Sequence, residues 1–276
     1  MEVKVLDCFD NEQNIIKAFQ ECVEEQEIIF VPETQDTIRL FKSIHLKKRW
    51  KNWKDTSGKD APPPDFFSDR YKIMMDVMRV DDHTFKNKKG KLVNPTQAKS
   101  TEIFKKLNPK GHDNLQIFTI VDSGLPTYLD HNYTYYRDSF IRVIEQHKQK
   151  IELYRRNHPD FKLVFFVFDE SSAYMENLQN TTVQEFYKSN PEQDTIIRGR
   201  PHYWWIDRDF LNCFLNTGID YLIWYTPFKA SKYLDVSLSF ERFKFPQAIV
   251  FDLNNLDIKN LDTKKYNEKY MIGAEA

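Results

Sequence analysis

Glycine is scarce in this chain, with seven among 276 residues. Loops that wrap a nucleotide phosphate need glycine where the backbone approaches the ligand closely. The sequence contains neither G-x-x-x-x-G-K-[ST] nor G-x-G-x-x-G, and it also lacks H-E-x-x-H and G-x-S-x-G. The common nucleotide-binding, zinc-protease and serine-hydrolase classes are therefore not indicated.

Cysteine pairs, long apolar runs and a basic leader are also missing. Three cysteines without a C-x-x-C pair form neither a disulfide framework nor a cysteine-rich zinc site. No segment approaches the apolar length that spans a bilayer, and the first residues, MEVKVLDCFDNEQN, carry acids where a signal peptide has basic residues. We expect a cytoplasmic protein without a membrane partner.

What is present is an alternation of helical and extended segments. Apolar periodicity predicts helices at 10–26, 94–107, 133–157 and 207–218 and strands at 27–34, 114–124, 162–171, 220–228 and 247–253. This order predicts one α/β domain over residues 1–276, with a central mixed sheet flanked by helices. A polar stretch at about 177–200 is expected to form a peripheral excursion. The sequence carries no signal for an oligomeric state.

The segment 42–59, KSIHLKKRWKNWKDTSGK, interleaves cations with two tryptophans. Cations beside flat aromatic faces are suited to the phosphates and bases of single-stranded or distorted nucleic acid. The alternative interpretation is a solvated helix that its tryptophans anchor to the core. The predicted nucleic-acid contacts are Lys47, Lys48, Arg49, Trp50, Lys51 and Trp53.

The segment 61–82, APPPDFFSDRYKIMMDVMRVDD, has the pattern of a β-hairpin with acids inside it. By strand alternation Asp76 shares a face with Met74 and Met78, whereas Arg79 points to the other face. A carboxylate among apolar neighbours is costly unless it is paired, protonated or bound to a cation. Asp65, on the adjoining strand or turn, is close enough in sequence to share a divalent metal with Asp76.

These residues resemble the PD-(D/E)xK nucleases, which have the restriction-endonuclease-like fold. Pro64-Asp65 matches the PD, and Asp76-Val77-Met78 matches the (D/E)xK with methionine at the lysine position. The resemblance implies a hydrolase that cleaves DNA or RNA phosphodiesters with Mg²⁺ held by Asp65 and Asp76. It also implies a cation in place of the missing lysine and a glutamate from a preceding helix. The candidates are Lys72, Lys99 or Arg79 for the cation and Glu12 for the glutamate.

Other interpretations of the same acids and histidines stay open. An inactive nuclease-like fold, a purely structural Asp76, and a non-catalytic protein that binds nucleic acid or another protein all fit the sequence. Asp122 is expected in a turn, Asp169 and Glu170 in solvent at a strand end, and Glu12 as a first-turn helix acid. Three histidines lack metal-ligand spacing and are expected at the surface or in hydrogen bonds: His83, His131 and His202.

Overall fold

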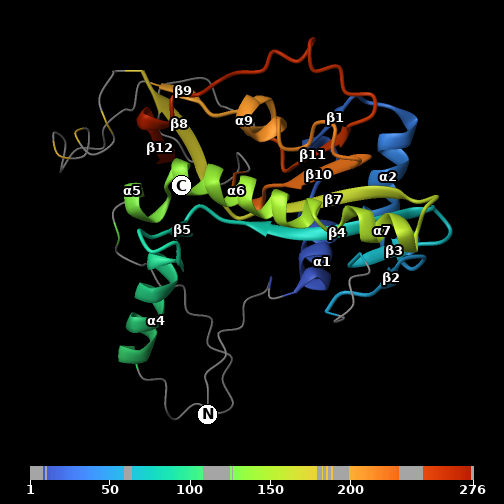
Figure 1. Ribbon diagram of the computed structural model, residues 1–276, viewed down its shortest axis with the longest axis horizontal. Helices are drawn as coiled ribbons and strands as arrows, with labels where there is room; N and C mark the ends of the chain where they lie inside the picture. The colour runs from blue at the N-terminus through green and yellow to red at the C-terminus, as the bar shows by residue number, and fades with distance from the viewer. Residues whose placement is uncertain are drawn as a thin grey trace.

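The computed structural model describes residues 9, 11–58, 64–107, 125, 127–178, 182, 185, 188, 199–229 and 245–274. Its centre is a seven-stranded mixed sheet in the order β1-β11-β10-β7-β4-β3-β2 (Figure 1). Strands β4, β7 and β10 are parallel neighbours, and β3 pairs with β4 antiparallel. The predicted α/β fold with a mixed central sheet is confirmed. The strands are β1 (Ile28–Val31), β2 (Lys54–Asp55), β3 (Phe66–Ser68), β4 (Ile73–Val80), β7 (Lys162–Asp169), β10 (Tyr221–Tyr225) and β11 (Ala248–Asp252).

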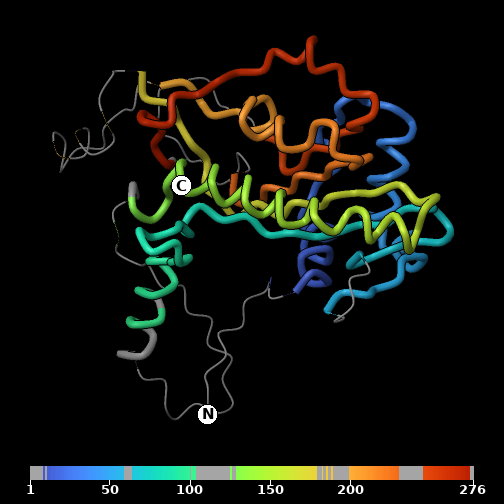
Figure 2. Tube along the Cα trace, in the orientation of Figure 1, coloured from blue at the N-terminus to red at the C-terminus, as the bar shows by residue number. Residues whose placement is uncertain are grey.

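Helices cover both faces of the sheet, as the paths in Figure 2 show. Helices α1 (Glu12–Cys22) and α2 (Gln35–His45) pack on the face that receives Met75 and Val77. Helices α6 (Tyr133–Lys148), α7 (Ile151–Asn157) and α9 (Arg208–Leu211) pack on the face that receives Met74 and Met78. The alternation predicted for β4 is therefore confirmed, and it divides the core into two layers.

Smaller elements surround this core. A second sheet has the order β12-β8-β9, and a two-stranded sheet pairs β5 with β6. None of the described helices combines the length and apolar character needed to cross a bilayer. The remaining elements are α3 (Lys47–Trp50), α4 (Pro95–Leu107), α5 (Thr127–Asp130), β5 (Phe85–Lys86), β6 (Leu92–Val93), β8 (Ala173–Asn177), β9 (Gly199–Pro201), β12 (Met271–Ala274), η1 (Glu25–Glu27), η2 (Trp204–Ile206), η3 (Pro227–Lys229) and η5 (Glu268–Tyr270).

Several predicted boundaries change. The helix expected at 133–157 is two helices, α6 and α7, separated at Gln149 and Lys150. The break keeps Ile151 and Tyr154 buried against the sheet, with 7% and 1% exposure. The helix expected at 207–218 forms only as α9, behind an Asp207 N-cap. The strand predicted at 114–124, with Asp122, lies outside the described residues, as does most of the excursion at 177–200.

Asp169, at the end of β7, is fully buried rather than in solvent, so that expectation was wrong. Its Oδ2 accepts hydrogen bonds from the Tyr136 hydroxyl at 2.6 Å, Trp224 Nε1 at 2.9 Å and Lys229 Nζ at 2.9 Å. Lys229 is also fully buried, and burial lowers the pKa of its ammonium while the charge of Asp169 opposes that shift. The lysine therefore compensates a carboxylate that water cannot reach.

The Lys229→Met substitution tests this compensation. It leaves Asp169 as a buried charge without its cation, and we expect a loss of about 3–5 kcal/mol in the free energy of unfolding by urea. Lys259→Met, at an exposed position, is the control and should change little. Adding Asp169→Asn to Lys229→Met should recover part of the loss. A loss below about 1 kcal/mol, the range of exposed pairs, would contradict this account.

Candidate functional site

The hairpin of β3 and β4 brings Asp65 and Asp76 together. Phe66 pairs with Met75 across the two strands, so Asp65, one residue before β3, stands opposite Asp76. Directly opposite residues of an antiparallel pair point to the same face. The two carboxyl groups are in hydrogen-bonding contact, and Asp65 Oδ2 also accepts the backbone N–H of Val77 at 2.8 Å. The two acids of the PD-(D/E)xK resemblance are therefore adjacent.

The electrostatics of this pair are unfavourable. The Asp76 side chain is only 2% exposed. Burial first, and then repulsion from Asp76, raise the pKa of Asp65 to about 8, although the Val77 N–H opposes the shift. The charge of Glu12 raises the pKa of Asp65 further. Without a cation, the pair therefore holds a proton near neutral pH.

Two side chains from the helical layer contact Asp76. His147, near the end of α6, places its Nδ1 2.6 Å from Asp76 Oδ2. The Tyr154 hydroxyl on α7 also bonds to Asp76, and burial raises the pKa of Tyr154 well above its usual value, so the hydroxyl stays a donor. Neither residue was predicted from the sequence. One feature of the sequence could have indicated His147: it is a polar residue at helical spacing between the buried Ile144 and Ile151.

The cations proposed from sequence do not reach the pair. Met78, at the family's lysine position, is buried in the core with 2% exposure. Strand β4 pairs with β7 without a bulge over all eight residues, so Arg79 stays on the other face and pairs with Glu170 at 2.6 Å. Lys72 Nζ lies 5.0 Å from the centroid of the Phe161 ring, and Lys99 pairs with Glu102 on α4.

Glu12 lies in the first turn of α1, behind an Asn11 side chain that accepts the Asn14 N–H. The positive end of the helix stabilises an acid at this position, which is the role of a first-turn helix acid expected from the sequence. Its charge still acts on Asp65, in the direction that disfavours ionisation. Glu12 is therefore electrostatically coupled to the pair, and no direct contact joins it to Asp65 among the described contacts.

The tryptophans of the basic segment pack inward. Trp53 is 8% exposed, and its Nε1 donates to the Ser43 carbonyl oxygen at 3.0 Å. Trp50 is half-buried, with ring centroids 5.3 Å from Trp53 and 5.1 Å from Phe66. This is the anchoring role of the alternative interpretation, so Trp53 offers no free face for a base.

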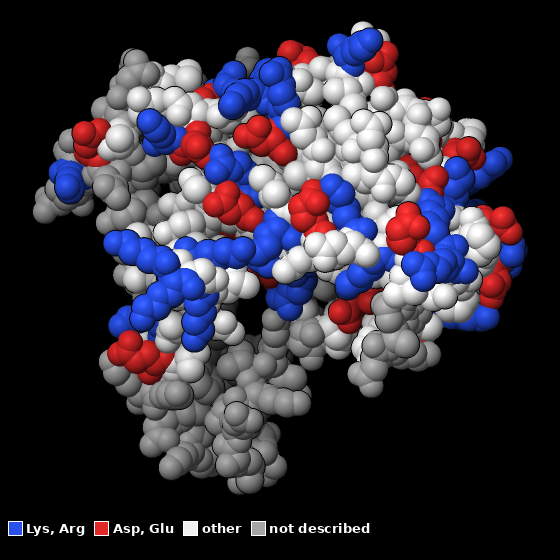
Figure 3. Space-filling model, viewed as in Figure 1, with Lys and Arg blue, Asp and Glu red and all other residues white. Residues whose placement is uncertain are grey.

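Part of the basic segment lines a pocket of about 670 Å³, which we call the basic groove. Lys48 and Arg49 are the predicted contacts that line it, whereas Lys51 does not and Lys47 pairs with Glu21 at 2.8 Å. Over the face shown in Figure 3, basic side chains lie among acidic ones. In the groove, Arg39 pairs with Asp36 at 3.5 Å. The groove is lined by Arg39, Lys48, Arg49, Asn52, Arg70 and Tyr71.

The three histidines are in hydrogen bonds, as expected, but two of them also gather around one carboxylate. His83 and His131 lie together with Asp82, with one ligand atom of each residue within 4.8 Å of the others. His131 is 49 residues from Asp82, so spacing in the sequence could not show this cluster. His202 is in a hydrogen bond, with its Nε2 2.6 Å from Asp207 Oδ2.

Comparisons of the chain with protein-family models, curated proteins and solved structures found no match. The resemblance of residues 64–78 to the PD-(D/E)xK nucleases therefore rests on the residues and the hairpin geometry alone.

The Asp65→Asn substitution tests the electrostatics of the pair. Because the folded-state pKa of Asp65, about 8, exceeds the usual value, the folded chain keeps a proton that the unfolded chain releases. The contribution of Asp65 to stability is therefore greatest at acidic pH and is lost as the pH rises toward 8. In chelator, the thermal midpoint of Asp65→Asn relative to wild type should rise between about pH 5 and pH 8.

Asp69→Asn is the matched control in the same hairpin. Asp69 is exposed, and a hydrogen bond from Lys54 lowers its pKa, so it stays ionised over this range. Its difference from wild type should be constant with pH. An equally constant difference for Asp65→Asn would show that Asp65 does not carry the raised pKa.

Proposed function

We propose that this chain is a Mg²⁺-dependent nuclease of the PD-(D/E)xK type that hydrolyses phosphodiester bonds of DNA or RNA. The observation that carries the proposal is the direct contact of Asp65 with Asp76 across adjacent antiparallel strands. Among the described residues, neither acid has a lysine or arginine partner. Two adjoining carboxyl groups whose repulsion no lysine or arginine relieves offer the oxygen ligands that Mg²⁺ prefers.

Each residue of the pair has support that fixes its position. The Val77 N–H orients Asp65, and His147 and Tyr154 orient Asp76. When bound, Mg²⁺ supplies a Lewis acid for the phosphate and lowers the pKa of a coordinated water. We assign His147 to the place of the missing lysine, because it is the described side chain on Asp76 that can carry a positive charge.

The same hairpin links this pair to the basic groove. Arg70 and Tyr71 lie in the turn between β3 and β4, and Arg70 donates to Asn52 Oδ1 at 3.2 Å. Four cationic side chains line the groove, of which Arg39 also pairs with Asp36 at 3.5 Å, and such a set is suited to successive phosphates of a nucleic acid. The proposal therefore includes a nucleic-acid partner. It also includes the cytoplasmic location expected from the sequence.

A second candidate function is nucleic-acid binding without catalysis. The near-complete burial of Asp76, with bonds from His147 and Tyr154, favours it, because a carboxylate satisfied in this way needs no metal. The basic groove would then act alone. Cleavage and binding experiments distinguish the two functions.

Cleavage of labelled nucleic acid tests the nuclease proposal. Wild type should cut single-stranded DNA, duplex DNA or RNA in Mg²⁺ or Mn²⁺ and not in chelator. Asp76→Asn and Asp65→Asn should each lower the rate by about 100-fold or more, since a carboxylate ligand is removed at nearly constant volume. Asp69→Asn should keep the wild-type rate. Circular dichroism and the thermal midpoint report whether each variant is folded.

No metal-dependent cleavage of any of the three substrates by folded wild type would contradict the nuclease proposal. Equal loss of rate in Asp69→Asn would also contradict it, because that acid lies outside the pair.

The basic groove makes its own prediction about salt. Arg49→Ala and Arg70→Ala should each reduce the slope of log affinity against log salt by about 0.7–0.9, as expected when one phosphate contact is lost. Lys51→Ala is the matched control, because Lys51 is an exposed cation of the same segment outside the groove. Fluorescence anisotropy with a labelled oligonucleotide measures the slopes. Unchanged slopes in both arginine variants would show that the basic groove does not contact the phosphates of the nucleic acid.

A further inference from the structure

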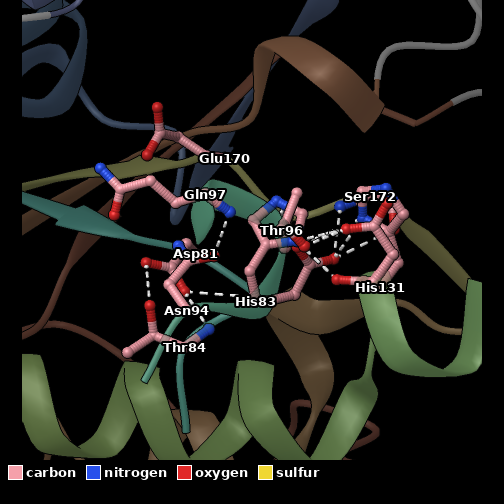
Figure 4. Close-up of polar contacts among 12 residues, drawn as sticks. Asp81, His83, Thr84, Asn94, Thr96, Gln97, His131, Glu170 and Ser172 are labelled. Atoms are coloured by element: carbon pink, nitrogen blue, oxygen red, sulfur yellow. Dashed lines mark hydrogen bonds and ion pairs between the residues drawn. The ribbon is translucent and has the colours of Figure 1, made fainter. Parts of the chain in front are cut away.

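A second polar cluster lies beyond the carboxyl end of β4, away from the Asp65–Asp76 pair. Asp82 and His83 come just after β4, beyond Asp81, and His131 follows α5. Figure 4 shows His83 and His131 in this cluster. Asp82 Oδ1 lies 3.3 Å from His131 Nδ1 and 3.5 Å from His83 Nε2. His131 Nδ1 is also 3.2 Å from Asp82 Oδ2. The carboxyl edge of parallel strands is the usual place for ligand sites in α/β sheets.

These separations are long for hydrogen bonds to a buried carboxylate. The other histidine–aspartate pairs of this protein, His147 with Asp76 and His202 with Asp207, both have 2.6 Å between nitrogen and oxygen. Ligand atoms about 2.0–2.2 Å from one tetrahedral Zn²⁺ stand about 3.3–3.6 Å from one another. The distances around Asp82 Oδ1 therefore match ligands that share a metal ion better than they match direct bonds.

The second oxygen of Asp82 is held by other groups. Asp82 Oδ2 accepts the Tyr174 hydroxyl at 2.5 Å, the Ser172 backbone N–H at 3.0 Å and the Ser172 hydroxyl at 3.1 Å. Such outer contacts fix the orientation of a ligating carboxylate. They leave Oδ1 directed at both histidines.

His83 is oriented in the same way. Its Nδ1 lies 2.5 Å from the backbone oxygen of Asp130, which can only accept, so Nδ1 is the donor in this contact. The Asp130 side chain is itself held by the Thr96 hydroxyl. The other ring nitrogen, His83 Nε2, then faces Asp82 Oδ1 at 3.5 Å, a separation that fits two ligands of one metal ion.

The surroundings allow a metal to enter and keep one position open. The Asp82 side chain is fully buried, whereas His83 and His131 are 21% and 20% exposed. His131 also lines a pocket of about 300 Å³ together with Tyr133, Thr134 and Glu268.

We infer that Asp82, His83 and His131 form a Zn²⁺ site with three protein ligands and a fourth position open to water. Imidazole nitrogens suit Zn²⁺, whereas Mg²⁺ prefers oxygen ligands, so this site is chemically distinct from the Asp65–Asp76 pair. The inference does not depend on the nuclease proposal.

The test titrates tag-free, chelator-treated full-length protein with Zn²⁺ in competition with a chromophoric chelator. Wild type should bind one equivalent, and His83→Gln and His131→Gln should each weaken binding by about 100-fold or more. His158→Gln is the matched control, because His158 lies outside the cluster against Phe67 and Phe161. Asp65→Asn should also retain full Zn²⁺ affinity, which separates this site from the nuclease pair.

A spectroscopic measurement covers the case in which a histidine variant fails to fold. Co²⁺ bound to wild type should show the strong visible absorption of tetrahedral coordination, and one equivalent of Zn²⁺ should abolish it. The inference is overturned if wild type binds no equivalent of Zn²⁺ or gives no such spectrum. It is also overturned if both folded histidine variants bind Zn²⁺ as wild type does, or if only Asp65→Asn loses it.

Discussion

Buried carboxylates in the central sheet must each be compensated, and this constraint organises the layer under α6. Asp169 is paired with the fully buried ammonium of Lys229, whose Nζ lies 2.9 Å from Asp169 Oδ2. Asp82 faces two histidines at distances that fit a shared ion. Asp76 has a histidine and a tyrosine but also a second acid, Asp65, in contact with it. Only the arrangement around Asp76 adds a second negative charge, which is why we propose metal-dependent chemistry at that pair.

The acid pair could be predicted from the sequence because the hairpin is local. Asp76 comes eleven positions after Asp65, and the period-2 pattern of β4 fixes the face on which Asp76 lies. A tight antiparallel turn then sets the register that places the two acids opposite each other. The same alternation correctly placed Arg79 on the other face, away from the site.

The partners of these acids could not be predicted, because they come from distant segments. His147 is 71 residues from Asp76, and it meets the strand only because α6 crosses the sheet there. His131 reaches Asp82 in the same way. Asp169 was expected in solvent as a residue at a strand end, but Tyr136 and Lys229, both far away in sequence, enclose it. Sequence patterns define faces and registers, whereas these contacts depend on how helices pack over strands.

The central claim is that the Asp65–Asp76 pair holds a divalent cation of the Mg²⁺ class. Crystals soaked in Mn²⁺ and measured at the manganese absorption edge test it most directly, because the anomalous signal locates the ion itself. The account predicts a peak between the two carboxyl groups, about 2.0–2.6 Å from an oxygen of each. Saturating Mn²⁺ with no peak within reach of either Asp65 or Asp76 would contradict it.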